Sequence, residues 1–260
     1  MGDRSRERAG LLEALARALP VQIDRAALPA GNVGLIVVDA VQGFTRQGSM
    51  SDPISLGPMV AAIDALVREL DRRLGPRLHL LILRDRHHPE VPEPPYPPHC
   101  LAGTAESTLD PQLAWLAQHP RATVLDKDCI NGFVGAMRPA AEAGSWRNGL
   151  VDWARERQLA ALVLTGDCTD ICVSDLTVAL LSARNHGMLT SVPPGQRQAY
   201  AAAITALPIL VHVPACATYD LDPDGPLAPE TLRHPGALAQ HVGLWTMASR
   251  GARLVDGFSW

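Results

Sequence analysis

Four polar side chains stand at the ends of short apolar runs in this 260-residue sequence. They are Asp39, Asp85, Lys127 and Asp167, which close the runs 34–39, 79–85, 122–127 and 160–167. Continuous apolar runs of this length are typical of strands in a parallel sheet that is covered on both faces. Because open α/β sheets bind their ligands at the carboxyl ends of the strands, we expect the four side chains to meet in one crevice. One such residue alone is more often a loop cap or a surface charge, but four together predict a site.

Lys127 is the only lysine in the chain, and the other residues among its 23 lysines and arginines are all arginines. Arginine supplies surface charge as well as lysine does, but it is not deprotonated in proteins. The count therefore favours a position that needs an amine able to release its proton. An arginine-biased composition explains the same count without any function, and the count alone does not decide between the two.

Cys172 is the candidate nucleophile. It lies in GDCTDICV near the start of a helix predicted over 169–187, with Thr169 or Asp170 as the N-cap. The positive end of the helix dipole and a nearby ammonium both lower the pKa of a thiol, and a carboxylate can take up and return its proton. The backbone N–H groups of Cys168 and Cys172 are placed to face an oxyanion. The alternative is that Cys172 is a small buried residue of an amphipathic helix, which is the commoner fate of a cysteine.

An acid and three histidines occur together in RDRHHPEVPEPPYPPHC. Asp85 and His87 are two residues apart at a strand end, so their side chains point the same way, whereas His88 points away. His99 arrives on a proline-rich loop and completes an Asp-His-His set. Such mixed oxygen and nitrogen ligands suit one divalent ion, zinc first, with iron or manganese as alternatives. A histidine-rich surface loop that holds no metal is the competing interpretation.

The remaining elements must position these residues. Helical spacing of apolar residues predicts a helix over 58–74, and two further apolar runs predict strands over 209–215 and 252–256. Strands that alternate with helices predict an α/β fold, a three-layer sandwich around a doubly wound, mainly parallel sheet. We expect one domain over residues 1–260, with residues 1–30 as an N-terminal helical extension. Two long irregular stretches interrupt the alternation, namely 86–107 and 188–207, the second with a short inserted helix.

Composition narrows the classes of partner. A net charge of −4 gives no reason to expect nucleic acid or an acidic membrane surface, and no apolar run reaches the roughly 18 residues of a membrane span. The five cysteines are an odd number in apolar surroundings, which favours free thiols and a cytoplasmic location over a disulfide framework. Three of them are expected to be packing residues (Cys100, Cys129 and Cys216), with Cys129 close enough to Lys127 to line the pocket. We expect a small-molecule substrate, no nucleic acid or membrane partner, and a homo-oligomer.

Several motifs resemble those of a known family. They are VVDAVQGF, EPPYPPHC, AGTAES, KDCINGFVG, GDCTDICV, SARNHG, CATYDL and a C-terminal HPGALAQHVGLW, which span residues 33–253 in order. In these motifs the chain resembles the isochorismatase-like cysteine hydrolases, and among them the plant-type nicotinamidases. Two features depart from the family pattern: Gln42 is three residues after Asp39 rather than two, and the stretch 188–207 is longer.

The resemblance implies a role for each matched position. Asp39 would be the general base, Lys127 its partner and Cys172 the nucleophile, with the oxyanion held by the backbone amides of Cys168 and Cys172 after a cis peptide bond. Asp85, His87 and His99 would hold the metal ion, whose open position accepts the pyridine nitrogen of the substrate. Tyr96 and Phe44 would enclose the ring, with Cys129 at the edge of the pocket.

The implied activity is hydrolysis of nicotinamide to nicotinate and ammonia through a cysteine thioester, in NAD salvage. The alternative is another small-amide hydrolase of the same fold, acting on a carbamoyl, ureido or pyrazinamide-type substrate. The carbamoyl and ureido amidases generally lack the Asp-His-His set, so bound metal would distinguish them from a nicotinamidase. An isochorismatase is disfavoured because those enzymes lack the catalytic cysteine. A catalytically dead binding protein would require a damaged triad, whereas Asp39, Lys127 and Cys172 are all present.

Overall fold

The computed structural model describes residues 2–91, 93–142, 144–193, 195–221 and 234–260. Within these ranges a seven-stranded sheet forms the centre, and every pair of neighbouring strands is parallel. In spatial order its strands are β1 (Ile23–Ala27), β9 (Arg253–Ser259), β8 (Ile209–Ala217), β7 (Leu159–Asp167), β2 (Asn32–Val38), β3 (Leu78–Asp85) and β4 (Ala122–Lys127). The expected doubly wound parallel sheet is therefore confirmed, and each of the six predicted strands is present.

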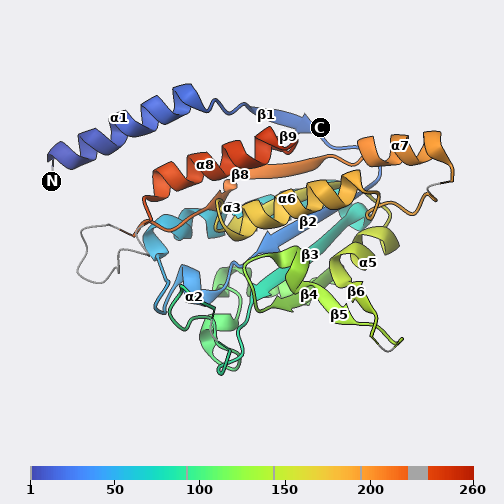
Figure 1. Cartoon of the computed structure of the whole chain (residues 1–260), viewed down its shortest axis with the longest axis horizontal. Helices are drawn as coiled ribbons and strands as arrows, with labels where there is room; N and C mark the ends of the chain where they lie inside the picture. Colours follow the sequence, from blue (N-terminus) through green and yellow to red (C-terminus); the bar gives the residue numbers. More distant parts are fainter. Residues whose placement is uncertain (1, 92, 143, 194, 222–233) are drawn as a thin grey trace.

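Helices cover both faces of the sheet, as continuous apolar strands require (Figure 1). On one face α3 (Pro53–Leu74) packs on side chains of β2 and β3, and Leu35 and Ile82 belong to this core. On the other face the core is formed with α5 (Gly149–Glu156), α6 (Cys172–Asn185) and α8 (Gly236–Ser249), and it includes Ile36 of β2. Because successive strand residues point to opposite faces, one apolar run supplies both cores.

The shorter elements lie around this sandwich. The helices are α1 (Gly2–Ala18), α2 (Gln42–Thr45), α4 (Gly132–Gly135) and α7 (Arg197–Thr205). The 3-10 helices are η1 (Gly75–Arg77), η2 (Ala105–Ser107) and η3 (Pro111–Gln118), and a separate antiparallel pair joins β5 (Met137–Pro139) to β6 (Trp146–Asn148). The helix expected within 188–207 is confirmed as α7. No helix in the described part of the chain is long and apolar enough to cross a membrane.

The N-terminal stretch 1–30 is helical only in part. The helix α1 lies along α8 at one side of the molecule (Figure 1), but residues 23–27 form β1 at the edge of the main sheet. The expectation of a purely helical extension was wrong because β1, IDRAA, is an exposed edge strand and lacks an apolar run. Only Ala26 of this strand is fully buried, so the sequence carried no periodic signal.

Candidate active site

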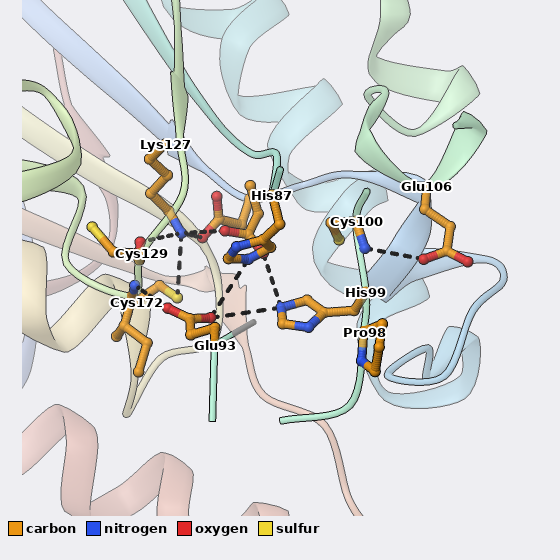
Figure 2. Close-up of polar contacts among 12 residues, drawn as sticks. His87, Glu93, Pro98, His99, Cys100, Glu106, Lys127, Cys129 and Cys172 are labelled. Carbon is orange, nitrogen blue, oxygen red and sulfur yellow. Dashed lines mark hydrogen bonds and ion pairs between the residues drawn. The ribbon is translucent and has the colours of Figure 1, made fainter. Parts of the chain in front are cut away.

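Three of the four strand-end residues lie together: Asp39 and Asp85 both contact Lys127. Its Nζ atom lies 2.8 Å from Asp39 Oδ2 and 2.9 Å from Asp85 Oδ1 (Figure 2). The sheet order explains this convergence, because β2, β3 and β4 are neighbours and Lys127 is paired with Asp85 in the strand register. Asp39 follows β2 with a left-handed backbone (φ 51°), which an aspartate tolerates better than most residues.

Lys127 is buried, with only 2% of its surface exposed. Its Nζ atom donates hydrogen bonds to Asp85, to the carbonyl oxygen of Cys129 at 3.0 Å and to the Cys172 sulfur. These three bonds use the three donors of the ammonium, and Asp39 forms an ion pair with the same group. Burial alone would lower the pKa of Lys127, but the charges of Asp39, Cys172 and Asp85 raise it well above its ordinary value. The lone lysine is therefore held as a cation between two acids.

The fourth strand-end residue, Asp167, is placed differently. It is buried, and burial raises its pKa well above the ordinary value. The residue before it, Gly166, has a φ of 120°, and a Cβ atom there would lie 2.0 Å from the carbonyl oxygen of Val38. Only glycine allows β7 to end this close to β2, beside Asp39.

Cys172 stands next to the ammonium. Its Sγ atom lies 3.8 Å from Lys127 Nζ, and the Asp39 carboxyl group is close enough to influence the pKa of the thiol. Burial is the strongest influence and raises the pKa of Cys172 well above its ordinary value, although Lys127 acts in the opposite direction. The expectation of a thiol pKa lowered at rest was therefore wrong, since it counted the ammonium and the helix dipole but not the loss of water. A base must accept the thiol proton before attack.

Asp39 is suited to be that base. Its carboxyl group is fully buried, and burial raises its pKa from 3.8 to about 6, with the charge of Asp85 acting in the same direction and Lys127 against it. A carboxylate with a pKa of about 6 is a far better proton acceptor than an exposed aspartate and still ionises at neutral pH. Proton exchange between Cys172 and Asp39 is therefore the chemistry that this arrangement supports.

The loop before Cys172 carries the candidate oxyanion hole. The backbone N–H groups of Ile171 and Val173 both donate to the carbonyl oxygen of Cys168, at 3.1 and 3.0 Å. The expected cis peptide bond is present between Asp167 and Cys168. The helix α6 begins at Cys172 with Ile171 as its N-cap, and no side chain caps it.

The prediction of Thr169 or Asp170 as the N-cap was therefore wrong. Both residues have other partners: the N–H group of Thr169 donates to the carbonyl oxygen of Ala217, and the Asp170 carboxylate is bonded to His234. Cys172 nonetheless occupies the first helical turn as expected, where the free N–H groups of the helix point.

Asp85, His87 and His99 lie together, and their ligand atoms are all within 4.8 Å of one another. Asp85 Oδ2 lies 2.9 Å from His87 Nε2 and 3.1 Å from His99 Nε2. The Nδ1 atom of His99 lies 2.8 Å from the carbonyl oxygen of Pro97, which places the proton on Nδ1 and leaves Nε2 free to bind a metal. These residues therefore fit a divalent ion with mixed oxygen and nitrogen ligands. His88 is exposed and takes no part, as predicted.

Glu93 is a site residue that the sequence analysis missed. Its Oε2 atom lies 3.5 Å from His87 Nε2 and 3.8 Å from His99 Nε2, and Oε1 accepts a hydrogen bond from the backbone of Ile130 (Figure 2). It therefore connects the histidine loop to the segment that follows Lys127. An acid in a proline-rich loop carries no spacing signal, so only the folded chain reveals this connection.

A narrow cavity with about 30 Å³ of free volume opens onto Cys172 and Lys127. Phe44 and Tyr96 line it as predicted, whereas Cys129 is not among the lining residues and contributes only its carbonyl oxygen to Lys127. The lining residues that sequence reasoning did not identify are Met50, Glu93, Ile130, Ile171 and Tyr219.

Fold and site together define the class: a hydrolase with a parallel α/β sandwich fold, whose cavity is lined by a thiol, an ammonium and a buried acid. The family described as Isochorismatase domain matches residues 33–194, more than half of the chain. The chain therefore belongs to the isochorismatase family.

Three relatives give this assignment its context. The chain is similar to Nicotinamidase 1 of Arabidopsis thaliana, at 41% identity, with 88% of this chain and 87% of that protein covered. Its fold is similar to that of N-carbamoylsarcosine amidase from Thermoplasma acidophilum, with a TM-score of 0.55, 21% identity, and 86% and 95% of the two chains covered. It is also similar to that of the pyrazinamidase of Pyrococcus horikoshii in complex with zinc, with a TM-score of 0.54, 17% identity, and 86% and 99% covered.

Proposed function

We propose that this protein is a nicotinamidase, which hydrolyses nicotinamide to nicotinate and ammonia. The observation that carries the proposal is the position of Lys127, bonded to both Asp39 and Asp85 and 3.8 Å from the Cys172 sulfur. This single cation joins a nucleophile and its base to a candidate metal site at the edge of a small cavity. The 41% identity to Nicotinamidase 1 of Arabidopsis thaliana supports the choice of substrate. Production of nicotinate would place the protein in NAD salvage.

The first half of the reaction forms a thioester. Asp39 accepts the Cys172 proton, and the thiolate attacks the carboxamide carbon while Lys127 keeps its proton and its positive charge near the sulfur. The backbone N–H groups of Cys168 and Cys172 stabilise the oxyanion that develops. Asp39 then returns the proton to the amide nitrogen, the C–N bond breaks and ammonia leaves.

The second half hydrolyses the thioester. Asp39, again a carboxylate, accepts a proton from a water molecule whose oxygen attacks the thioester carbon. The C–S bond breaks, Cys172 recovers its proton from Asp39, and the carboxylic acid formed loses its proton to solvent and leaves as nicotinate. Each proton taken by Asp39 is returned in the same half-reaction, so the acid ends each half as it began.

Asp85, His87 and His99 would hold one divalent ion, with zinc as the first choice on the chemistry of the ligands. An ion bound there supplies an open ligand position for the pyridine nitrogen and so orients the ring. The zinc complex of the Pyrococcus horikoshii pyrazinamidase supports this choice of metal. Phe44 and Tyr96 would then enclose the ring from the sides of the cavity.

A second candidate function is hydrolysis of another small amide, such as a carbamoyl compound. The similarity to the fold of N-carbamoylsarcosine amidase keeps this candidate open, because the fold alone does not select the substrate. The Asp-His-His set argues against it, since a carbamoyl group needs no ligand position for a ring nitrogen.

Ammonia release from a panel of amides by the purified protein tests the proposal. The panel contains nicotinamide, pyrazinamide, benzamide and N-carbamoylsarcosine. We expect kcat/KM to be highest for nicotinamide and much lower for benzamide, which has the same ring size but no ring nitrogen. Equal turnover of nicotinamide and benzamide, or preferred turnover of the carbamoyl compound, would contradict the assignment.

A further inference from the structure

His234 lies outside residues 33–194, which match the Isochorismatase domain, and it is not one of the residues predicted for the site. It nevertheless contacts the nucleophile loop, residues 168–172. Its Nε2 atom lies 2.8 Å from Asp170 Oδ2, and its Nδ1 atom lies 2.7 Å from the carbonyl oxygen of Tyr219. Both partners are hydrogen-bond acceptors. A histidine can donate to two acceptors at once only when both ring nitrogens carry a proton, so this geometry fits an imidazolium paired with an ionised Asp170.

The charges of the two side chains agree with that geometry. Burial alone would raise the pKa of Asp170, but the hydrogen bond from His234 lowers it below its ordinary value. Burial alone would lower the pKa of His234, but the hydrogen bond and the charge of Asp170 raise it. The side chains are only 13% and 15% exposed, so they form an ion pair that is largely shielded from solvent.

The two acceptors belong to two different walls of the cavity. Asp170 is two residues before Cys172 in the nucleophile loop, whereas Tyr219 follows β8 and its side chain lines the cavity together with Cys168 and Cys172. The Tyr219 and His234 rings also face each other, with centroids 4.1 Å apart and an interplanar angle of 30°. One imidazolium therefore bonds to Asp170 of the nucleophile loop and also packs against the Tyr219 ring in the second wall.

The start of α8 fixes His234 in this place. A Cβ atom at Gly243 would lie 2.6 Å from the Cα atom of Asp170, and one at Gly236 would lie 2.8 Å from the carbonyl oxygen of Tyr219. The backbone groups of His234 and Leu221 also bond to each other in both directions, at 3.1 and 3.3 Å. The contacts at both glycines hold α8 close to both Asp170 and Tyr219, next to the segment that carries His234.

We propose that His234 is a positioning residue, whose imidazolium joins Asp170 to Tyr219 and so sets the distance between the nucleophile loop and the wall that faces the substrate ring. This inference rests on the proposed function. His234 does not touch the reacting atoms, and the proton exchange between Cys172 and Asp39 does not require it. Its loss should weaken the placement of the substrate and leave the intrinsic reactivity of the thiol unchanged.

The test compares His234→Ala, Tyr219→Ala and the double variant with the wild-type protein. Two quantities are measured: kcat and KM on whichever amide of the panel the wild type turns over, and the rate at which iodoacetamide alkylates Cys172, mapped by mass spectrometry. For His234→Ala we expect KM to rise about tenfold with a smaller change in kcat, and alkylation to stay within about twofold. In the double variant the KM increases should not multiply, because both substitutions loosen the same wall. His234→Gln carries both of its N–H donors on one nitrogen atom and cannot reach both acceptors as the two ring nitrogens do, so it should give an intermediate KM.

His241→Ala is the matched control. His241 lies on α8, and its Nε2 atom bonds to the carbonyl oxygen of Leu19, away from the cavity, so its loss should leave KM unchanged. A His234→Ala variant with wild-type KM overturns the inference, and so does one in which alkylation of Cys172 falls in parallel with kcat/KM. A wild-type protein that turns over none of the amides instead overturns the proposed function, and the inference with it.

Discussion

Replacement of Lys127 by arginine separates a need for positive charge from a need for this particular amine. In the structure three acceptors converge on one nitrogen atom: Asp39 at 2.8 Å, Asp85 at 2.9 Å and the Cys129 carbonyl at 3.0 Å. A guanidinium distributes its donors over three nitrogen atoms in a plane and cannot present them at one point. There is also little room, because only 2% of the Lys127 surface is exposed.

The arginine must therefore displace at least one of the two acids from its partner. We expect kcat/KM on nicotinamide to fall by about 10²-fold or more, the size of effect that follows a misplaced catalytic group. Such a loss corresponds to about 2.7 kcal/mol of transition-state stabilisation. Overpacking should add a stability loss of about 1–3 kcal/mol, which thermal melting will detect.

The assay is ammonia release by variants that thermal melting and circular dichroism show to be folded. Lys127→Met is the second test, since it removes the charge at similar length and should lose at least as much activity. Arg138→Lys is the matched control: Arg138 bonds to backbone carbonyl groups near β4, outside the cavity, and its exchange should leave kcat/KM within about twofold. A folded Lys127→Arg protein with near-normal kcat/KM would refute the reasoning and make the single lysine a compositional accident.

Three further predictions follow from the site. Cys172→Ala should abolish turnover and any covalent adduct, while Cys168→Ala should keep substantial activity because only its backbone is used; equal losses in both would count against the assignment. Elemental analysis of active protein should find one divalent ion per chain. Removal of the ion by a chelator, or His99→Ala, should raise KM by a larger factor than it slows alkylation of Cys172. Active protein without stoichiometric metal would exclude the site. Because burial raises the pKa of Asp39 to about 6 and the base must be ionised, kcat/KM should fall as the pH is lowered through 6, and a profile that stays flat well below that pH would argue against Asp39.

Three of the predicted site residues could be located from the sequence because each of them ends or follows an apolar run. They are Asp39, Asp85 and Lys127, and the carboxyl ends of neighbouring parallel strands lie at one edge of the sheet. Their burial could not be read in the same way. The raised pKa of Cys172 depends on the closure of the whole cavity around it, which local sequence does not encode.

The site residues that the sequence analysis missed lie on irregular segments. Glu93 comes from the proline-rich loop, Tyr219 from the segment after β8, and His234 from the turn that precedes α8. Their positions depend on tertiary contacts such as the bond between His234 and Asp170. That same bond explains why Asp170 does not cap α6, although its residue type and position favour an N-cap.

The two oxygen atoms of the Asp85 carboxylate face two different parts of the site. Its Oδ2 atom faces the two histidines and its Oδ1 atom faces Lys127, so a single carboxylate is shared between the metal ligands and the catalytic cation. Lys127 in turn forms an ion pair with Asp39 as well. The candidate metal ligands and Asp39 are therefore connected through two side chains, both of which are buried. A bulkier cation at position 127 would break this shared geometry, which gives a physical reason for lysine rather than arginine at this position.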